Sequence, residues 1–466
     1  MSTLSDTINK LGKFLLKYRR LANVHTVDFI IDNQWETIVP EKIKEELEDI
    51  DLTNFVTETG NLYKNICTKD HPTLQALILS CEKYSLDKLG ILTKVDSLFP
   101  NSQSKNLVKV DGFMSPKKEH EVQKLTNLIC DIVDKENVEL IVDVGSGKGY
   151  LSSNLSLNNP IKILGIDSCE TNNHGAMERK RKLQKVLKKS KVSTGKQHDP
   201  VNACDVLNEH FTVVTERLHS NVKLETIIPE YDNNTVSLLT GLHACGNLTS
   251  TALKLFSGTN IQSLCVVGCC YHHIEEKFCE SPFDNVNLED YLNPGFPLSR
   301  PLINLEYAIG RNARMLACQS IDRIACGQIT PSKKLFYRAL LQVILCDKLG
   351  RQCVKLSNFQ VGKIRKKCLD FQEYVRKSLT KLQLFDEIEI SDDELTIYLS
   401  KYASMEDRIC KFFYLRALLA PVIESLILLD RLQYLREQIN VRESHVVKLF
   451  DPVVSPRCYA LIANKV

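Results

Sequence analysis

The spacing of apolar residues changes three times along the chain. Up to about residue 100 they recur at helical spacing, for instance over 43–52 and over 71–92, where Pro72 suits a first helical turn. A polar linker, FPNSQSKN, follows. We therefore expect residues 1–105 to form a helical N-terminal region.

Between about residue 112 and residue 319, the apolar positions form short runs instead. The runs IVDVG, IKILGIDS, VSLLTGLHACG and SLCVVGCC alternate with polar and helical stretches. Short apolar runs separated by helices are typical of a parallel sheet with crossover helices. Residues 106–320 are thus predicted to form an α/β core with a Rossmann-like sheet.

Helical periodicity returns after about residue 335, and the last segment differs again. Residues 445–466 hold two strand-like runs joined by a turn with two prolines. If SLCVVGCC is the fifth strand, this hairpin completes the same sheet, which is then discontinuous in sequence. The predicted parts are a helical region 1–105, a core 106–320, a helical insertion 321–440 and a closing hairpin 441–466.

Composition places the chain among intracellular globular proteins. Its 466 residues, 43% of them hydrophobic, allow roughly two to four domains and a sizeable core. The 17 cysteines are spread along the chain and no secretory signal precedes them, so we expect reduced thiols in the cytoplasm or the nucleus. No apolar run reaches the ~18 residues of a membrane span, which predicts a soluble protein with no membrane contact.

Charge is informative only locally. A net charge of +3 and a pI near 8.0 are too mild to indicate a polyanionic partner. The cationic first 21 residues could imitate a mitochondrial presequence, but their apolar spacing favours a first amphipathic helix of the folded protein.

A glycine turn follows the first predicted strand. After the run Leu140–Val144, Gly145, Gly147 and Gly149 form a G-x-G-x-G turn that leads into a helix. Glycine tolerates positive φ and lets backbone amides approach a ligand closely. Asp167, which lies 20 residues after Gly147, ends the second strand, where an acid can accept hydrogen bonds from ribose hydroxyls. This pattern predicts a nucleoside-bearing cofactor.

Three cofactors compete for this turn. A P-loop needs Ser or Thr after Lys148, and a dinucleotide fingerprint needs glycine where Tyr150 stands, which disfavours ATP and leaves NAD as the runner-up. S-adenosylmethionine sites commonly carry an acid two residues before the first glycine, and Asp143 is there to hold the amino group. The alternative is a tight turn without a ligand. The predicted cofactor residues of this region are Asp143, Gly145, Ser146, Gly147, Gly149 and Asp167.

Histidines and cysteines end two later strands, at 241–246 (GLHACG) and 268–273 (GCCYHH). Carboxyl ends of parallel strands form the ligand crevice of an open sheet, so both groups should lie beside the cofactor. Zinc is the tempting alternative, with potential ligands His243, Cys245, Cys269, Cys270, His272, His273 and Cys279. No C-x2-C pair exists, and adjacent cysteines point in opposite directions on a strand, so we predict no metal site and read the cysteines as buried packing residues.

Several stretches together resemble the methyltransferase-like protein 25 family. They are FIIDNQWETIVPEKI (29–43), MSPKKEHEV (114–122), VDVGSGKGYLS (142–152), GLHACGNLT (241–249), VGCCYHH (267–273) and LFDPVVSPR (449–457). The resemblance covers nearly the whole chain. It implies an S-adenosylmethionine-dependent methyltransferase with a seven-stranded Rossmann-like sheet.

The motifs are also similar to those of a transfer-RNA ribose 2′-O-methyltransferase family, which has G-x-G-K-G, H-x-C-G and C-C-H-H segments. Here Tyr271 interrupts the last of these, and that family's zinc-finger elements are not evident.

Some members of the methyltransferase-like protein 25 family carry an adenine dimethylase name. The [ND]-P-P-[YF] segment that amino-directed enzymes place after the fourth strand is replaced here by HACG.

Methyl transfer requires alignment of the acceptor with the methyl group and, for a hydroxyl acceptor, removal of a proton. His243, His272 and His273 are the candidates for that base or for orienting the acceptor. Methyltransferases often fold a helix over the cofactor just before the first strand. The cationic Lys118 is therefore a further predicted cofactor residue, and a charged surface helix capped by Ser115 is the alternative.

The segment 177–191, MERKRKLQKVLKKSK, holds eight cations and one acid. It predicts an electropositive helix able to bind RNA phosphates, with a solvated charged face as the alternative. The leading hypothesis is an RNA methyltransferase. A protein methyltransferase and a non-catalytic cofactor-binding adaptor remain open, as does the oligomeric state.

Overall fold

The computed structural model describes residues 3–51, 71–100, 114–190, 210–220, 222, 227, 234–278, 293–331, 333–357, 359, 364 and 368–466. The chain divides into two compact units. The sheet unit comprises Met1–Leu16, Lys83–Ser320 and Ala420–Val466, and the helical unit comprises Lys17–Glu82 and Ile321–Leu419.

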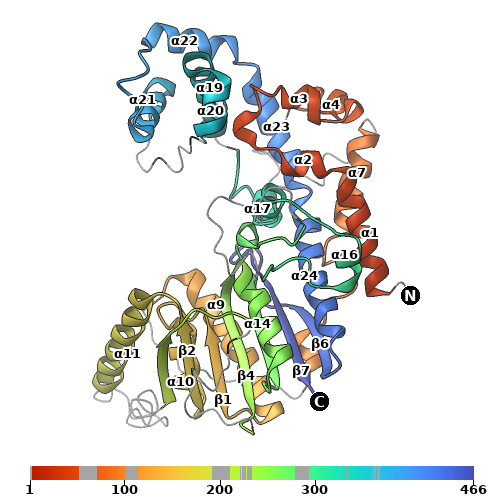
Figure 1. The fold of residues 1–466 in the computed structure, drawn as a ribbon, viewed down its shortest axis with the longest axis vertical. Helices are drawn as coiled ribbons and strands as arrows, with labels where there is room; N and C mark the ends of the chain where they lie inside the picture. The colour runs from red at the N-terminus through yellow and green to blue at the C-terminus, as the bar shows by residue number, and fades with distance from the viewer. Residues whose placement is uncertain are drawn as a thin grey trace. The chain divides into compact units, whose positions relative to one another are not determined.

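The sheet unit contains one seven-stranded sheet (Figure 1). Its strands are β1 (Leu140–Val144), β2 (Lys162–Asp167), β3 (Phe211–Thr215), β4 (Ser237–Cys245), β5 (Ser263–Cys269), β6 (Val441–Lys448) and β7 (Tyr459–Lys465). The order is β3-β2-β1-β4-β5-β7-β6. The first five strands run parallel, while β7 is antiparallel to both β5 and β6. The predicted α/β class is confirmed, and the closing hairpin lies in the same sheet.

The unit boundaries depart from the predicted parts in two places. Helix α24 (Ala420–Arg436), which the sequence assigns to the insertion, belongs to the sheet unit because it packs against α14 (Asn247–Gly258) and β6. The predicted region 1–105 is divided between the two units, and its expected boundary lies outside the described residues. Strand β3 has no counterpart among the predicted runs, because FTVVT is short and partly exposed.

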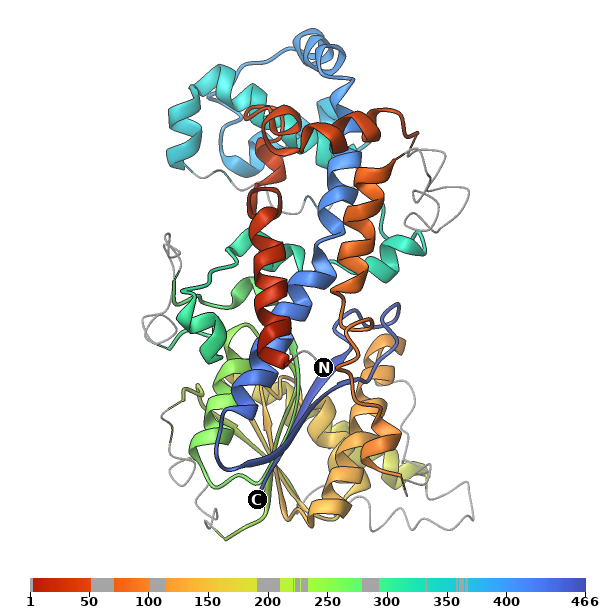
Figure 2. The same ribbon diagram turned by 90° about the vertical axis from the view of Figure 1, so that its right-hand side faces the viewer.

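Helices cover both faces of the sheet. Besides α14 and α24, the sheet unit holds α1 (Leu4–Lys17), α8 (Val95–Leu98), α9 (Pro116–Glu136), α10 (Tyr150–Asn158), α11 (Glu170–Ser190), η2 (Tyr271–His273), α16 (Arg300–Asn304) and α17 (Arg311–Leu316). Both α9 and α14 contact β4 and β5, from opposite faces of the sheet (Figures 1 and 2). Ser115 caps α9 by accepting a hydrogen bond from the Lys118 amide, as the alternative interpretation of this segment expects.

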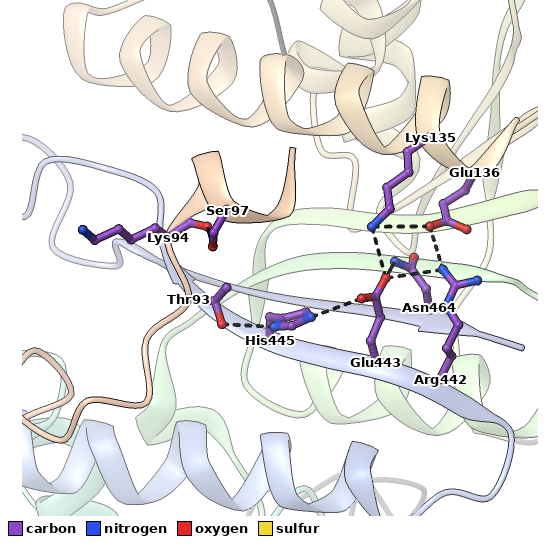
Figure 3. Close-up of polar contacts among 9 residues, drawn as sticks. All are labelled: Thr93, Lys94, Ser97, Lys135, Glu136, Arg442, Glu443, His445 and Asn464. Carbon is purple, nitrogen blue, oxygen red and sulfur yellow. Dashed lines mark hydrogen bonds and ion pairs between the residues drawn. The ribbon is translucent and has the colours of Figure 1, made fainter. Parts of the chain in front are cut away.

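A polar network holds the edge strand β6 to its neighbours (Figure 3). Glu443 accepts hydrogen bonds from Lys135 of α9 at 3.3 Å and from Asn464 of β7 at 2.9 Å. Burial opposes ionisation of Glu443, but these contacts outweigh it and lower its pKa to about 2. His445 Nδ1 lies 3.0 Å from the Thr93 hydroxyl. Charged side chains on an edge strand also discourage pairing with another chain.

The helical unit is described by its own elements. They are α2 (Arg19–Asn23), η1 (Thr26–Asp28), α3 (Gln34–Ile38), α4 (Glu41–Glu48), α7 (Pro72–Lys83), α18 (Ile321–Ala325), α19 (Lys333–Leu349), α20 (Arg351–Ser357), α21 (Phe371–Leu382), α22 (Asp392–Lys401) and α23 (Met405–Ala417). Trp35, the only tryptophan, is 1% exposed, and its indole N–H donates to Glu48. Buried Arg416 donates to the carbonyls of Leu21 and Ala22.

Among the described residues, one helical run, Met405–Arg436, is long and apolar enough to cross a membrane by length and composition. Its most apolar window is 89% buried inside the protein, as in the core helix of a soluble protein. The run is therefore weak evidence for a membrane span, although it corrects the expectation that no apolar stretch approaches the necessary length.

Candidate active site

A cavity of about 290 Å³ opens at the carboxyl ends of the parallel strands. It lies where strand order reverses between β1 and β4, the usual ligand crevice of an open α/β sheet. Its lining residues are Gly145, Ile166, Asp167, Ser168, Glu216, Arg217, Leu218, Cys245, Gly246, Asn247, Leu248, Thr251 and His273. Ends of four successive strands in the sheet therefore face one space.

The glycine turn has the left-handed backbone that its composition predicts. The φ angles of Gly145, Gly147 and Gly149 are 68°, 56° and 63°. The left-handed φ of Gly145 disfavours any other residue, and a Cβ atom there would lie 2.7 Å from Leu248 Cδ2, which would have to move. The turn thus leaves bare backbone at the cavity wall.

Asp167 lines the cavity at the end of β2. Its carboxylate accepts hydrogen bonds from the Gly147 amide at 2.9 Å, the Cys169 amide at 2.9 Å and the Asn172 side chain at 3.1 Å. A carboxylate offers about four acceptor positions, so acceptor capacity remains for a ligand. The side chain therefore joins the glycine turn to the cavity.

Of the seven predicted cofactor residues, Gly145 and Asp167 line the cavity and the other five do not. Asp143 is 1% exposed and accepts a 2.5 Å hydrogen bond from Ser152. Burial raises the pKa of Asp143 to about 7. Ser146 is buried, and its hydroxyl has no hydrogen-bond partner among the described residues. The Lys118 ammonium lies 5.0 Å from the centre of the Tyr150 ring.

The three candidate histidines occupy different positions. His273 lines the cavity, and its ring centre is 4.0 Å from that of His272. His272 Nδ1 lies 3.6 Å from the Cys318 thiol, and burial lowers the His272 pKa. His243 does not line the cavity, although it has a φ of 64° and sits beside an irregularity in the pairing of β4 with β5.

Glu121 holds His243 in a defined orientation. His243 Nε2 lies 3.0 Å from one Glu121 oxygen, and the Ser455 hydroxyl donates to the other at 2.6 Å. Burial opposes ionisation of Glu121, but these hydrogen bonds outweigh it and lower the pKa to about 2. An ionised Glu121 only accepts, so Nε2 carries the proton and Nδ1 is left as the nitrogen able to accept one. The MSPKKEHEV, HACG and VVSPR stretches thus meet here.

Three cysteine sulfur atoms gather at the edge of the cavity. Cys245 lines it, and its Sγ lies 2.8 Å from that of Cys269 and 3.4 Å from that of Cys270. The Cys269 and Cys270 sulfurs are 3.5 Å apart, so the expectation that adjacent cysteines point in opposite directions is wrong. The reason is local: β5 ends at Cys269, and Cys270 has φ 50° and ψ 50°. Cys279 lies outside the described residues.

The basic segment coincides with the second half of α11. Arg179 stacks on Tyr150, and the Lys180 ammonium donates to the Phe211 carbonyl, so these two cations serve packing. The exposed cations with described side chains are Arg181, Lys182 and Lys185. Side chains of 187–190 and the whole of Lys191 lie outside the described residues.

Residues 216–218 line the cavity but were not among the predicted site residues. They follow β3, the strand that the hydrophobic pattern misses. A polar pair, Glu216 and Arg217, directly after FTVVT is the signal that would have located them.

Two full-length relatives carry the same family name. The chain is 32% identical to "Probable methyltransferase-like protein 25" of Mus musculus over 589 aligned positions, covering 100% of this chain and 97% of the relative. The Homo sapiens protein of that name is 32% identical over 599 positions, covering 100% and 98%. The chain belongs to the methyltransferase-like protein 25 family. Residues 117–277 also match a family described as a methyltransferase domain, so the predicted resemblance and enzyme class are confirmed.

Two solved methyltransferases show only a weak overall likeness. The plantazolicin methyltransferase BamL, in complex with a triazolic desmethylPZN analog and SAH, is 9% identical with a TM-score of 0.20, and the match covers 69% of this chain and 92% of that chain. Coclaurine N-methyltransferase, bound to N-methylheliamine and SAH, is 13% identical with a TM-score of 0.22 and covers 84% and 97%. Scores this low carry no argument about the site.

Proposed function

We propose that this methyltransferase binds S-adenosylmethionine in the strand-end cavity and transfers its methyl group to RNA. The observation that carries the cofactor assignment is the cavity itself. Its wall combines the bare backbone of Gly145, the carboxylate of Asp167 and the His273 side chain. A nucleoside with a charged tail requires these features: close backbone approach, an acceptor for ribose hydroxyls and a polar lining.

The residues present fit that cofactor. The cavity volume of about 290 Å³ is at the small end of the ~300–1,000 Å³ typical of ligand pockets. Asn247 lines the cavity, and its side-chain N–H group is a buried donor that has no partner among the described residues. When bound, S-adenosylmethionine supplies an activated methyl group. The protein's own contribution is to orient the acceptor and to remove its proton.

Two histidines support transfer to a hydroxyl or an amine. His273 lies at the cavity wall, where it can accept a proton from an acceptor bound there. His243 is oriented by Glu121 with Nδ1 available, which suits a residue that positions an acceptor. The site therefore offers one candidate base and one candidate positioning residue.

RNA is favoured over protein by charge on α11. Its exposed Arg181, Lys182 and Lys185 follow one another within five residues, and only the first is paired with a described acid, Glu178. Cations on an exposed helix attract a polyphosphate backbone whatever its sequence. The similarity of the HACG and CCYHH segments to a transfer-RNA enzyme family points the same way.

Label transfer tests both parts of the proposal. The protein is incubated with cell extract and S-adenosylmethionine carrying a labelled methyl group, and the products are digested with nuclease or protease. We expect macromolecular label that nuclease removes and that the Asp167→Ala variant does not produce. Label that only protease removes would refute RNA as the acceptor, whereas no label together with no cofactor binding would refute the function altogether.

A further inference from the structure

The three thiols of Cys245, Cys269 and Cys270 form the densest group of metal-binding side chains among the described residues. Their sulfur atoms all lie within 4.8 Å of one another. They come from the ends of two neighbouring strands, β4 and β5, and are therefore brought together by the sheet and not by local sequence. We propose that they bind one zinc ion beside the cofactor cavity.

The sulfur geometry is close to that of a three-thiolate zinc site. Zinc bonds thiolate at about 2.3 Å with tetrahedral angles, which places ligand sulfurs about 3.8 Å apart. The distances from Cys270 Sγ are 3.4 Å to Cys245 and 3.5 Å to Cys269. The Cys245 and Cys269 sulfurs, now 2.8 Å apart, have to separate by about 1 Å, and the other two pairs by about 0.3 to 0.4 Å. Small side-chain rotations therefore convert the cluster into a zinc site.

Two residues in or next to the cluster have an unfavourable backbone conformation. His243 and Cys270 both have left-handed φ angles, 64° and 50°, which non-glycine residues seldom adopt. His243 lies at the register irregularity between Leu242 and Ala244, two residues before Cys245, and the φ of Cys270 turns its side chain back toward Cys269. Strained residues of this kind persist where the surrounding structure and a function require them. Here one such residue lies two positions before Cys245, and the other is Cys270 itself.

A buried cation provides the second, independent indication. Arg431 of α24 is 1% exposed, and in the part of the chain that the structure describes its three guanidinium nitrogens have no hydrogen-bond partner. A Cβ atom at Gly268 would lie 2.7 Å from Arg431 Nη1, so the guanidinium packs against β5 directly before Cys269. Zinc with three thiolates carries one net negative charge. The neighbouring buried carboxylate of Asp430 already accepts hydrogen bonds from Leu298 and Ser299. Arg431, which makes no hydrogen bond with it among the described residues, supplies a positive charge close to Cys269 that balances the charge of the zinc site.

Three protein ligands leave one coordination position free. No histidine or carboxylate among the described residues joins the three sulfurs within the same radius, and Cys245 faces the cavity. Catalytic zinc sites characteristically keep such a position for water or for a substrate atom. Each thiol that binds zinc releases its proton to solvent, so loading is favoured as pH rises.

Metal analysis tests this inference independently of methyl transfer. The full-length protein is purified under reducing conditions without chelator, and its metals are measured by mass spectrometry. We expect about one zinc per chain in the wild type, and less than about a tenth of that in Cys245→Ser and Cys270→Ser. Cys326→Ser, which removes an exposed cysteine of the helical unit, is the matched control and should retain the metal.

A second measurement needs no variant. Replacement of zinc by cobalt in the wild-type protein should produce the visible absorption of tetrahedral, thiolate-bound cobalt, and a chelator should expose three additional reactive thiols. A wild-type protein without zinc or cobalt absorption would overturn the proposal. So would a different metal at the same stoichiometry, or a disulfide between Cys245 and Cys269.

Discussion

At the residue scale, Asp167 links the glycine turn to the cavity. Its carboxylate accepts from the Gly147 amide, so an amide side chain of the same shape preserves part of that contact while losing acceptor capacity for ribose hydroxyls. We expect Asp167→Asn to weaken S-adenosylmethionine binding by more than about 1 kcal/mol, measured by isothermal titration. Asp386→Asn removes an exposed carboxylate elsewhere and should leave the affinity unchanged. Equal affinities for the wild type, Asp167→Asn and Asp386→Asn would show that Asp167 does not bind the cofactor.

Glu121 makes the stability of the protein pH-dependent. Its folded pKa is about 2, below the usual 4.5, so its contribution is present above pH 4.5 and is lost as pH falls toward 2. The difference corresponds to at most about 3 kcal/mol. We expect Glu121→Gln to destabilise the protein at pH 7 and to flatten the loss of stability on acidification, measured by denaturant unfolding between pH 7 and pH 3. In contrast, Glu45→Gln changes an exposed acid and should keep the wild-type slope.

At the element scale, the hairpin of β6 and β7 completes the sheet from the far end of the chain. Ile462 of β7 is 1% exposed and pairs with Cys265 of β5. Burial of a charge there is unfavourable, so Ile462→Asp should lower the free energy of unfolding by more than about 3 kcal/mol and abolish cofactor binding. Val466→Asp, four residues later at a position that is 96% exposed, should change stability by no more than about 0.5 kcal/mol. Similar effects of the two substitutions would contradict the assigned register.

The basic half of α11 is the element that the RNA proposal depends on. We expect Lys182→Glu with Lys185→Glu to weaken binding to a pool of small cellular RNA roughly tenfold near 0.1 M salt, because phosphate contacts become repulsive. The dependence of affinity on salt should also become shallower. Lys42→Glu with Lys334→Glu makes the same change in net charge on exposed lysines of the helical unit, and should have little effect. Equal weakening by both pairs would mean that only net charge matters.

Elements with strong periodicity were the most predictable. Apolar runs bounded by glycine or proline predict β1 before the glycine turn, β2 after it, and the closing hairpin. Such runs leave few alternatives for burial. The five-residue β3 lacks a sustained run and was missed together with Glu216 and Arg217 of the cavity wall. Helix α24 has helical character in the sequence, but its membership of the sheet unit depends on long-range packing.

At the scale of the whole molecule, the sheet unit is built from three separate segments of the chain, and the helical unit from the two segments between them. Trp35 lies in the helical unit, whereas the cofactor cavity lies in the sheet unit. A ligand stabilises the unit that binds it, by about 2.7 kcal/mol at 100 times its dissociation constant. We expect S-adenosylmethionine to raise the temperature at which the sheet unit unfolds, as monitored by hydrogen exchange of its amides. The unfolding temperature of the helical unit, as monitored by Trp35 fluorescence, should not change. Equal shifts of both signals would show that the two units unfold together.

What the sequence determined by itself is local backbone geometry and the chemical class of the site. Glycines at alternate positions predict the left-handed turn, and an acid at the next strand end predicts where a ribose would bind, because strand periodicity places both at one sheet edge. Only the tertiary structure decided which distant side chains meet there. The Glu121, His243 and Ser455 contacts, the three clustered thiols and the buried Arg431 depend on strand register, on two left-handed residues and on packing between segments far apart in sequence. Residue spacing along a chain does not encode such contacts.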